Sequence, residues 1–159
     1  MSARADALAA RLAEVSGQAI EVIERIPDER WGATCEAEGW TVAATARHLT
    51  TAIGPEMAVA RLLAGGQAAP GDWDALHARN AQRAEAYASA PRDETLDLLR
   101  RGRQEAIGFV QGLDDAELDR AAPLWLFDDR VASAQEFIER VLIGHIRGHL
   151  ASIRATAGV

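Results

Sequence analysis

The chain of 159 residues is poor in cysteine, in aromatic residues and in long apolar runs. Its single cysteine, Cys35, cannot form an internal disulfide, which is typical of proteins from a reducing compartment. No apolar run approaches the roughly 18 residues of a membrane span, and residues 1–6 already include charges. We therefore expect neither a signal peptide nor a transmembrane segment, and we predict a cytoplasmic protein.

Basic residues are the minority among the charged ones. The chain has 17 basic and 24 acidic residues, which gives a formal net charge of −7, and no basic stripe is interleaved with aromatics. Proteins that bind nucleic acids usually present clustered positive charge to the phosphates. We therefore do not expect nucleic acid as a partner.

Helical periodicity dominates what is present. Hydrophobic residues make up 48% of the chain and alanine is abundant. Apolar residues recur every three or four positions, as in helices with one buried face, over residues 3–26, 41–63, 92–112 and 134–155. A shorter and more polar helix is expected from Trp73 to Tyr87, and no segment alternates as a strand would. The sequence thus predicts one all-α domain over residues 1–159, an up-down four-helix bundle with an accessory helix between the second and third main helices.

The connections carry the expected breakers and caps. Residues 27–39 and 122–130 lack a sustained period, so both are predicted to be irregular. Thr41 is predicted to cap the second main helix, which continues past Pro55. Ser133 is predicted to cap the last helix, with Glu136 completing a capping box.

The last helix carries His145 and His149, four residues apart. This spacing places both imidazoles on one side, about one turn apart, where they could bind one cation. At about 100° per residue from Ile138, the two histidines flank the centre of the apolar stripe. The pattern therefore predicts that they lie in the middle of the buried face. The alternative is that they are packing or capping groups without a metal.

His48 lies on the shoulder of the second main helix and could provide a third ligand if it turns inward. Three neutral imidazoles without a thiolate are typical of a catalytic zinc or related divalent site, in which one coordination position stays open for water or substrate. Taken by itself, His48 could instead be a surface histidine with an ordinary hydrogen bond.

Two other reactive residue types are interpreted as ordinary. His77 lies beside Asp74 in the polar accessory helix and is predicted to be exposed. Cys35 is followed by Glu36 and Glu38, whose negative charges would raise the pKa of the thiol and disfavour a nucleophilic thiolate.

Several residues could complete a site without being ligands. Asp128 and Asp129 could supply a base near its mouth, although an acidic pair in a loop is usually solvated. Trp40 and Trp125 could line a pocket at the end of the bundle or simply close the core. A strip of small residues on the last helix could approach another backbone, in this chain or in a homodimer; its members are Gly144, Gly148, Ala151 and Ala155.

Two segments together resemble the DinB-like metal-binding family. They are Gly39-Trp40-Thr41-Val42-Ala43-Ala44-Thr45-Ala46-Arg47-His48-Leu49 and His145-Ile146-Arg147-Gly148-His149-Leu150. That family includes the N-terminal domain of mycothiol-dependent maleylpyruvate isomerase and thiol S-transferases that use bacillithiol or mycothiol. The similarity covers nearly the whole chain. It implies a four-helix bundle whose metal is held by His48, His145 and His149.

The resemblance also implies an activity. We expect a divalent-metal-dependent enzyme, a transferase or isomerase that uses a low-molecular-weight thiol such as mycothiol or bacillithiol on a small electrophilic substrate. Zinc is the first expectation for the metal, with nickel, cobalt, manganese and iron as alternatives. Because the chain ends at Val159, the second domain of the isomerase is not expected. The alternatives are a metal-dependent hydrolase and a bundle that binds a metal or a small ligand without turnover.

Overall fold

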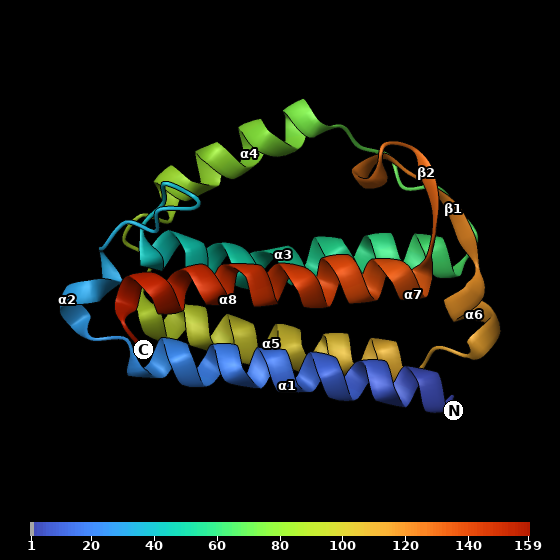
Figure 1. Ribbon diagram of the computed structural model, residues 1–159, viewed down its shortest axis with the longest axis horizontal. Coiled ribbons are helices and arrows are strands. Elements are labelled where there is room, and N and C mark those ends of the chain that lie inside the picture. Colours follow the sequence, from blue (N-terminus) through green and yellow to red (C-terminus); the bar gives the residue numbers. More distant parts are fainter. Residues whose placement is uncertain (1) are drawn as a thin grey trace.

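Each of the four amphipathic segments forms a long helix with its apolar face inward (Figure 1). The computed structural model describes residues 2–159. The helices are α1 (Ala3–Arg25), α3 (Val42–Ala64), α5 (Arg92–Gln111) and a continuous run formed by α7 (Ala134–Phe137), the π-helical segment η2 (Ile138–Ile143) and α8 (Gly144–Ala157). The predicted all-α four-helix bundle is confirmed, and α3 continues past Pro55.

The order and direction of the helices bring α3 beside α8. Both α1 and α3 contact α5 as well as α8. α3 and α5 run in the same direction, because Arg47 contacts Glu94 near their starts and Arg61 contacts Phe109 near their ends. α3 and α8 run in opposite directions (Figure 1). Because α3 also contacts α8, the two helices that carry the candidate histidines lie side by side.

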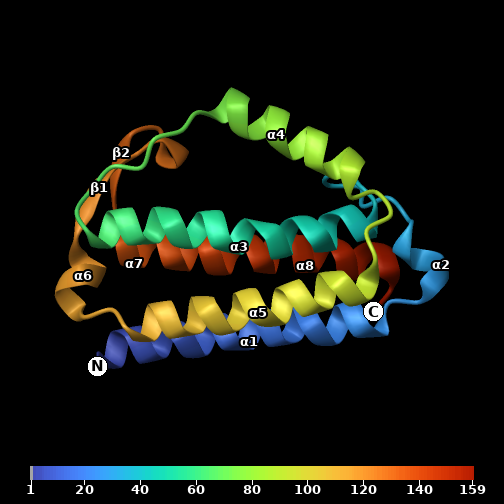
Figure 2. The same ribbon diagram turned by 180° about the vertical axis from the view of Figure 1, so that it is seen from behind.

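The accessory helix α4 (Trp73–Ala86) returns the chain from the end of α3 to the start of α5 (Figure 2). Asp72 caps it by accepting a hydrogen bond of 2.8 Å from the Ala75 amide. None of its residues is buried, which agrees with its polar sequence. Among the residues that the structure describes, no helix has the length and apolar character needed to cross a bilayer.

A β-hairpin corrects the expectation that no strands form. β1 (Ala121–Leu124) pairs antiparallel with β2 (Arg130–Ser133), and the 3₁₀ turn η1 (Trp125–Phe127) lies between them. The hairpin includes the segment 122–130 that was predicted to be irregular and extends beyond it at both ends. Strands of four residues are too short to show a clear alternation. The turn is closed by Asp128 and Asp129, whose φ angles of +53° and +59° are left-handed, a conformation that aspartate tolerates better than most residues.

The segment 27–39, also predicted to be irregular, contains the single helical turn α2 (Asp28–Trp31). A second short helix, α6 (Asp115–Asp119), follows α5. These turns lie at opposite ends of the bundle (Figure 1).

Caps at two helix starts were predicted, and one is only half formed. Thr41 accepts a hydrogen bond of 3.1 Å from the Ala44 amide, as expected. Ser133 likewise accepts a bond of 3.1 Å from the Glu136 amide. The Glu136 side chain does not return to the cap, however, because it pairs with Arg130 at 2.7 Å. The predicted capping box is therefore wrong in its second half, since an ion pair competes for the carboxylate.

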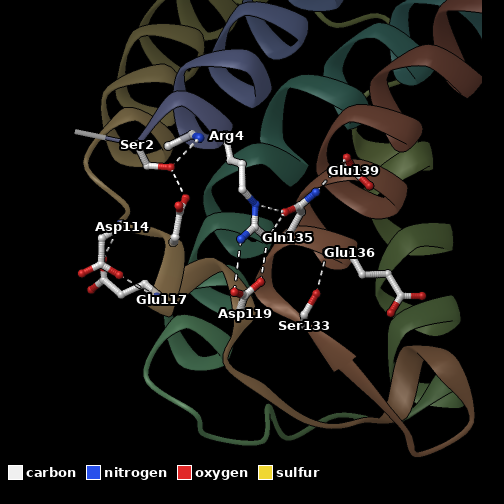
Figure 3. Close-up of polar contacts among 11 residues, drawn as sticks. Ser2, Arg4, Asp114, Glu117, Asp119, Ser133, Gln135, Glu136 and Glu139 are labelled. Atoms are coloured by element: carbon white, nitrogen blue, oxygen red, sulfur yellow. Dashed lines mark hydrogen bonds and ion pairs between the residues drawn. The ribbon is translucent and has the colours of Figure 1, made fainter.

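A polar cluster joins the N-terminus to α6 and α7, at the hairpin end of the bundle (Figure 3). Arg4 donates two hydrogen bonds to Asp119, at 2.6 and 3.1 Å, and one of 3.0 Å to the side-chain oxygen of Gln135. Ser2 also donates to Asp115. We call Arg4, Asp119 and Gln135 the corner cluster.

Candidate metal centre

His48 turns inward, because α3 packs against two neighbouring main helices rather than one. Its buried surface extends around most of the first two turns, and the shoulder on which His48 lies faces α8. His48 is only 7% exposed. Its Nε2 lies 3.0 Å from Nε2 of His145.

The histidines of α8 lie beside the buried stripe and not at its centre, which corrects the sequence prediction. The buried positions of α8 are Ile146, Leu150, Ile153 and Ala157. Ala134 and Ile138 are also buried, earlier in the same run. In an unbroken α-helix the buried face that begins at these two residues would reach α8 one residue earlier than it does. The π-helical segment η2 contains the extra residue that accounts for this difference. The side chains of His145 and His149 therefore remain 23% and 15% exposed at the edge of the core.

The three imidazoles converge on one point. Nε2 of His145 lies 3.0 Å from Nε2 of His48 and 2.8 Å from Nε2 of His149. One nitrogen from each of the three residues lies within 4.8 Å of the other two. The structure thus brings together the three histidines that the sequence selected, from α3 and from two successive turns of α8.

Two carboxylates that sequence reasoning missed contact these rings from behind. Nδ1 of His149 lies 2.8 Å from Oε1 of Glu38, and Nδ1 of His145 lies 2.7 Å from Oε1 of Glu56. The second contact is off the direction of a straight hydrogen bond. In the sequence, Glu38 is notable only as a neighbour of Cys35. No local signal links either carboxylate to its histidine, because the pairs are far apart in the chain.

Burial controls the protonation of the site. Desolvation, followed by the neighbouring His145 and His149, lowers the pKa of His48 to about 3. Burial and His145 also lower the pKa of His149, although Glu38 acts in the opposite direction. Burial raises the pKa of Glu56, and its contact with His145 opposes this. At neutral pH the imidazoles of His48 and His149 are therefore uncharged and retain a lone pair.

The hydrogen-bonding arrangement is incomplete without a positive centre. A neutral imidazole has one donor nitrogen and one acceptor nitrogen. If His145 and His149 direct their Nδ1 protons to the carboxylates, their Nε2 atoms are both acceptors, although these atoms lie only 2.8 Å apart. A cation at the common point would satisfy both lone pairs and that of His48. The donor set therefore fits a divalent metal ion.

Of the two candidate tryptophans, Trp40 lies at the site and Trp125 does not. The Trp40 ring is 5.1 Å from the His48 ring, edge-on, and is stacked 6.4 Å from the His149 ring. Trp125 packs instead against Trp73, with 5.3 Å between ring centres. It also lies against Gly71, where an added Cβ would be 2.4 Å from the indole.

The remaining candidates lie outside the histidine cluster. Asp128 and Asp129 are exposed at the tip of the hairpin, at the end of the bundle opposite α2 (Figure 1). The idea that they lie at the mouth of the site is therefore not supported. His77 is exposed and packs edge-on against Trp73. Cys35 is a buried free thiol.

Two cavities lie away from the histidines. One, of about 450 Å³, lies beside Trp31 and Arg92, between α2 and the start of α5. The other, of about 190 Å³, lies between α3 and α5 around Gly54 and Gly102. Neither is lined by a histidine, so both are separate from the histidine cluster.

Comparisons with known proteins agree with this architecture. The model of the DinB superfamily matches residues 11–153. The fold is similar to a solved structure of YfiT from Bacillus subtilis, described as a probable metal-dependent hydrolase with an unusual four-helix bundle topology. The TM-score is 0.80 at 17% identity, covering 99% of this chain and 89% of that chain, a likeness that concerns the fold. No curated protein matches the sequence.

Proposed function

Because the chain belongs to the DinB superfamily, we propose that it is a metal-dependent enzyme whose divalent ion is bound by His48, His145 and His149. The observation that carries this proposal is the convergence of three Nε2 atoms, two of them 2.8 Å apart. Buried groups with the same hydrogen-bonding role are not brought together without a compensating partner. Zinc is the first candidate, and nickel, cobalt, manganese and iron have compatible ligand preferences.

Three protein ligands leave a coordination position for a small molecule. A divalent ion there supplies Lewis acidity and lowers the pKa of a coordinated water or thiol. The chain's own residues define the access. His48 and Trp40 close one side of the site, whereas the partial exposure of His145 and His149 leaves an approach from solvent.

For the reaction, we propose transfer of a low-molecular-weight thiol, such as mycothiol or bacillithiol, to a small electrophilic substrate. The support is the resemblance of residues 39–49 and 145–150 to the thiol-using members of the family. Coordination of the thiol would make it a thiolate at neutral pH, which is the reactive form. Metal-dependent hydrolysis is the second candidate, and the similarity of the fold to YfiT favours it.

We further propose that two chains associate through the exposed face of α8. Gly148, Ala151 and Ala155 are exposed, and an added Cβ at Gly148 would meet nothing within 4 Å. Small residues allow close approach of a second backbone. Sedimentation of the wild type and of a Gly148→Glu variant tests this, and a wild type that is monomeric at high concentration would contradict it.

The decisive experiment uses cobalt-substituted protein and a panel of thiols: mycothiol, bacillithiol, glutathione and coenzyme A. A thiol that coordinates the ion should produce a sulfur-to-metal charge-transfer band, and electrophiles are then tested with that thiol. Hydrolysis of an ester or amide without any such band would favour the hydrolase. If neither assay responds, a non-catalytic metal-binding or small-ligand-binding bundle is the better description.

A further inference from the structure

Both histidines of α8 contact a carboxylate through the nitrogen that faces away from the common point. Glu38 and Glu56 are themselves only 11% and 13% exposed. We infer that Glu38 and Glu56 are positioning residues: they hold the Nδ1 protons of His149 and His145, and thereby direct the Nε2 lone pairs of these rings at the metal. This inference rests on the proposed function, because it names how the same site is oriented.

Glu38 is held in place by groups other than its histidine. Ser152, three residues after His149, donates a hydrogen bond of 2.5 Å to Oε2 of Glu38. The loop that carries Glu38 is closed by the Gly39 amide, which donates to the Cys35 carbonyl at 2.9 Å. Gly39 has a φ of +71°, which a side chain would disfavour. Both oxygens of Glu38 are therefore occupied, and its orientation is determined by the loop and by α8.

Glu56 is oriented differently. It lies two turns after His48 on α3, and its Oε2 has no hydrogen-bond partner among the residues of the structure, 2–159. A buried oxygen without a partner is costly, so its retention needs a reason. A cation bound to the far nitrogen of His145 would place positive charge across the ring from this carboxylate. The pair is then stabilised when the site is loaded.

His48 lacks this arrangement, which makes the inference specific. In the described part of the chain its ring meets the edge of Trp40, and no contact with a carboxylate is present. Removing the charge of Glu38 or Glu56 should therefore alter one identified ligand each and leave His48 unchanged.

The first test measures zinc affinity by competition with a chelator. Glu38→Gln and Glu56→Gln keep the side-chain size but remove the charge, and the amide can donate to Nδ1 and so allow the opposite tautomer. We expect each variant to bind zinc roughly 10- to 100-fold more weakly than the wild type. The matched controls are Glu36→Gln and Glu105→Gln, which alter exposed glutamates and should stay within about twofold.

The second test reads the tautomers directly, because a merely structural role would not change them. Nitrogen-15 NMR of the zinc-loaded protein should show protected Nδ1 protons on His145 and His149. Glu56→Gln should remove the protection at His145 only, and Glu38→Gln that at His149 only. Circular dichroism checks folding, and Glu38→Asp, which keeps the charge, should recover part of the affinity.

The outcomes separate this inference from the proposed function. Unchanged zinc affinity, or Nδ1 signals that persist in both Gln variants, would overturn the role of the carboxylates. A wild type that binds none of zinc, nickel, cobalt, manganese and iron would end the proposed function instead. The tautomers of the metal-free protein would then decide the inference, which requires Nδ1 protonation of His145 and His149.

Discussion

The corner cluster and the histidine centre are both polar, but the first pairs opposite charges and the second brings together nitrogens of the same kind. In the corner cluster the positive Arg4 meets the negative Asp119, and their side chains are 41% and 65% exposed. In the histidine centre the Nε2 atoms of three buried or half-buried rings face one another. The first arrangement is complete in itself and partly solvated, whereas the second joins like groups at low exposure. Complementary surface contacts indicate local structure, and unmatched buried groups indicate a site.

The largest effect is expected on the metal content, which should depend on the histidine centre. Replacing His145 with Ala removes the ligand that lies between the other two, so stoichiometric metal should be lost. Elemental analysis of purified protein measures this. His77→Ala, which changes an exposed histidine outside the cluster, should retain one ion per chain. Full occupancy in His145→Ala would place the site elsewhere.

The second-largest effect is expected from acidification of the metal-free protein, which should lower its free energy of unfolding through the histidine centre. The pKa of His48 is lowered to about 3 in the folded protein, against an ordinary value of about 6.5, and that of His149 is lowered too. Between about pH 6.5 and pH 3 the unfolded chain binds a proton at His48 that the folded chain excludes, so stability falls as the pH falls through this window, by roughly 1 kcal/mol per pH unit for His48; His149 acts in the same direction. Glu56, with its raised pKa, acts in the opposite sense.

Urea titrations of the metal-free protein at several pH values measure this loss. In His48→Gln the slope between about pH 6.5 and 3 should be shallower, because one of the groups that resists protonation is gone. Arg4→Ala serves as the control from the other cluster and should retain the wild-type slope over the upper part of that window. Equal slopes in the wild type and in His48→Gln would contradict the assignment.

Metal removal at neutral pH should have a moderate effect. The bundle buries apolar faces along all four long helices, so the metal-free chain should keep its helical circular dichroism. If free ion exceeds Kd by about 100-fold, its loss costs about 2.7 kcal/mol, which corresponds to a Tm lower by roughly 5–10 °C. A random-coil spectrum after chelation would show that the ion is structural.

The smallest effect is expected at the corner cluster. Arg4→Ala removes exposed ion-pair and hydrogen-bond contacts, which contribute little because water already solvates the groups. We expect Tm to fall by no more than about 4 °C and metal content to stay unchanged. Calorimetry and elemental analysis of the same preparation measure both. A loss of metal in this variant would show that the two ends of the bundle are coupled.

Periodicity and spacing predicted the four long helices and the pair His145 and His149, because both signals lie within single segments of the chain. His48 lies in a different segment, and the resemblance to the DinB-like family was needed to join it to that pair. Glu38 and Glu56 could not be predicted, since each meets its histidine across the interface between α8 and the α2–α3 region. The hairpin was missed because its pairing depends on a turn at Asp128 and Asp129 rather than on an alternating pattern.

The depth of the histidines was mispredicted for a different reason. A uniform 100° step from Ile138 assumes an unbroken α-helix, and the π-helical segment η2 violates that assumption before His145 is reached. Nothing in the composition of residues 138–143 distinguishes them from α-helix formers. The buried stripe of α8 therefore falls on Ile146 and Leu150, one residue after each histidine.

The extra residue in η2 also has a consequence at the level of the gene. The π-helical segment accommodates one residue more than an α-helix would, so loss of the codon for the exposed Arg140 would let the run close into an uninterrupted α-helix. α7 and α8 would keep their relative orientation, with Ile146 and Leu150 in the core and His145 and His149 facing His48. The same loss within α7 or α8, which contain no extra residue, would turn the helix on one side of the deletion by about 100° relative to the other side. A single in-frame deletion is therefore expected to be tolerated in η2 and not in the helices that flank it.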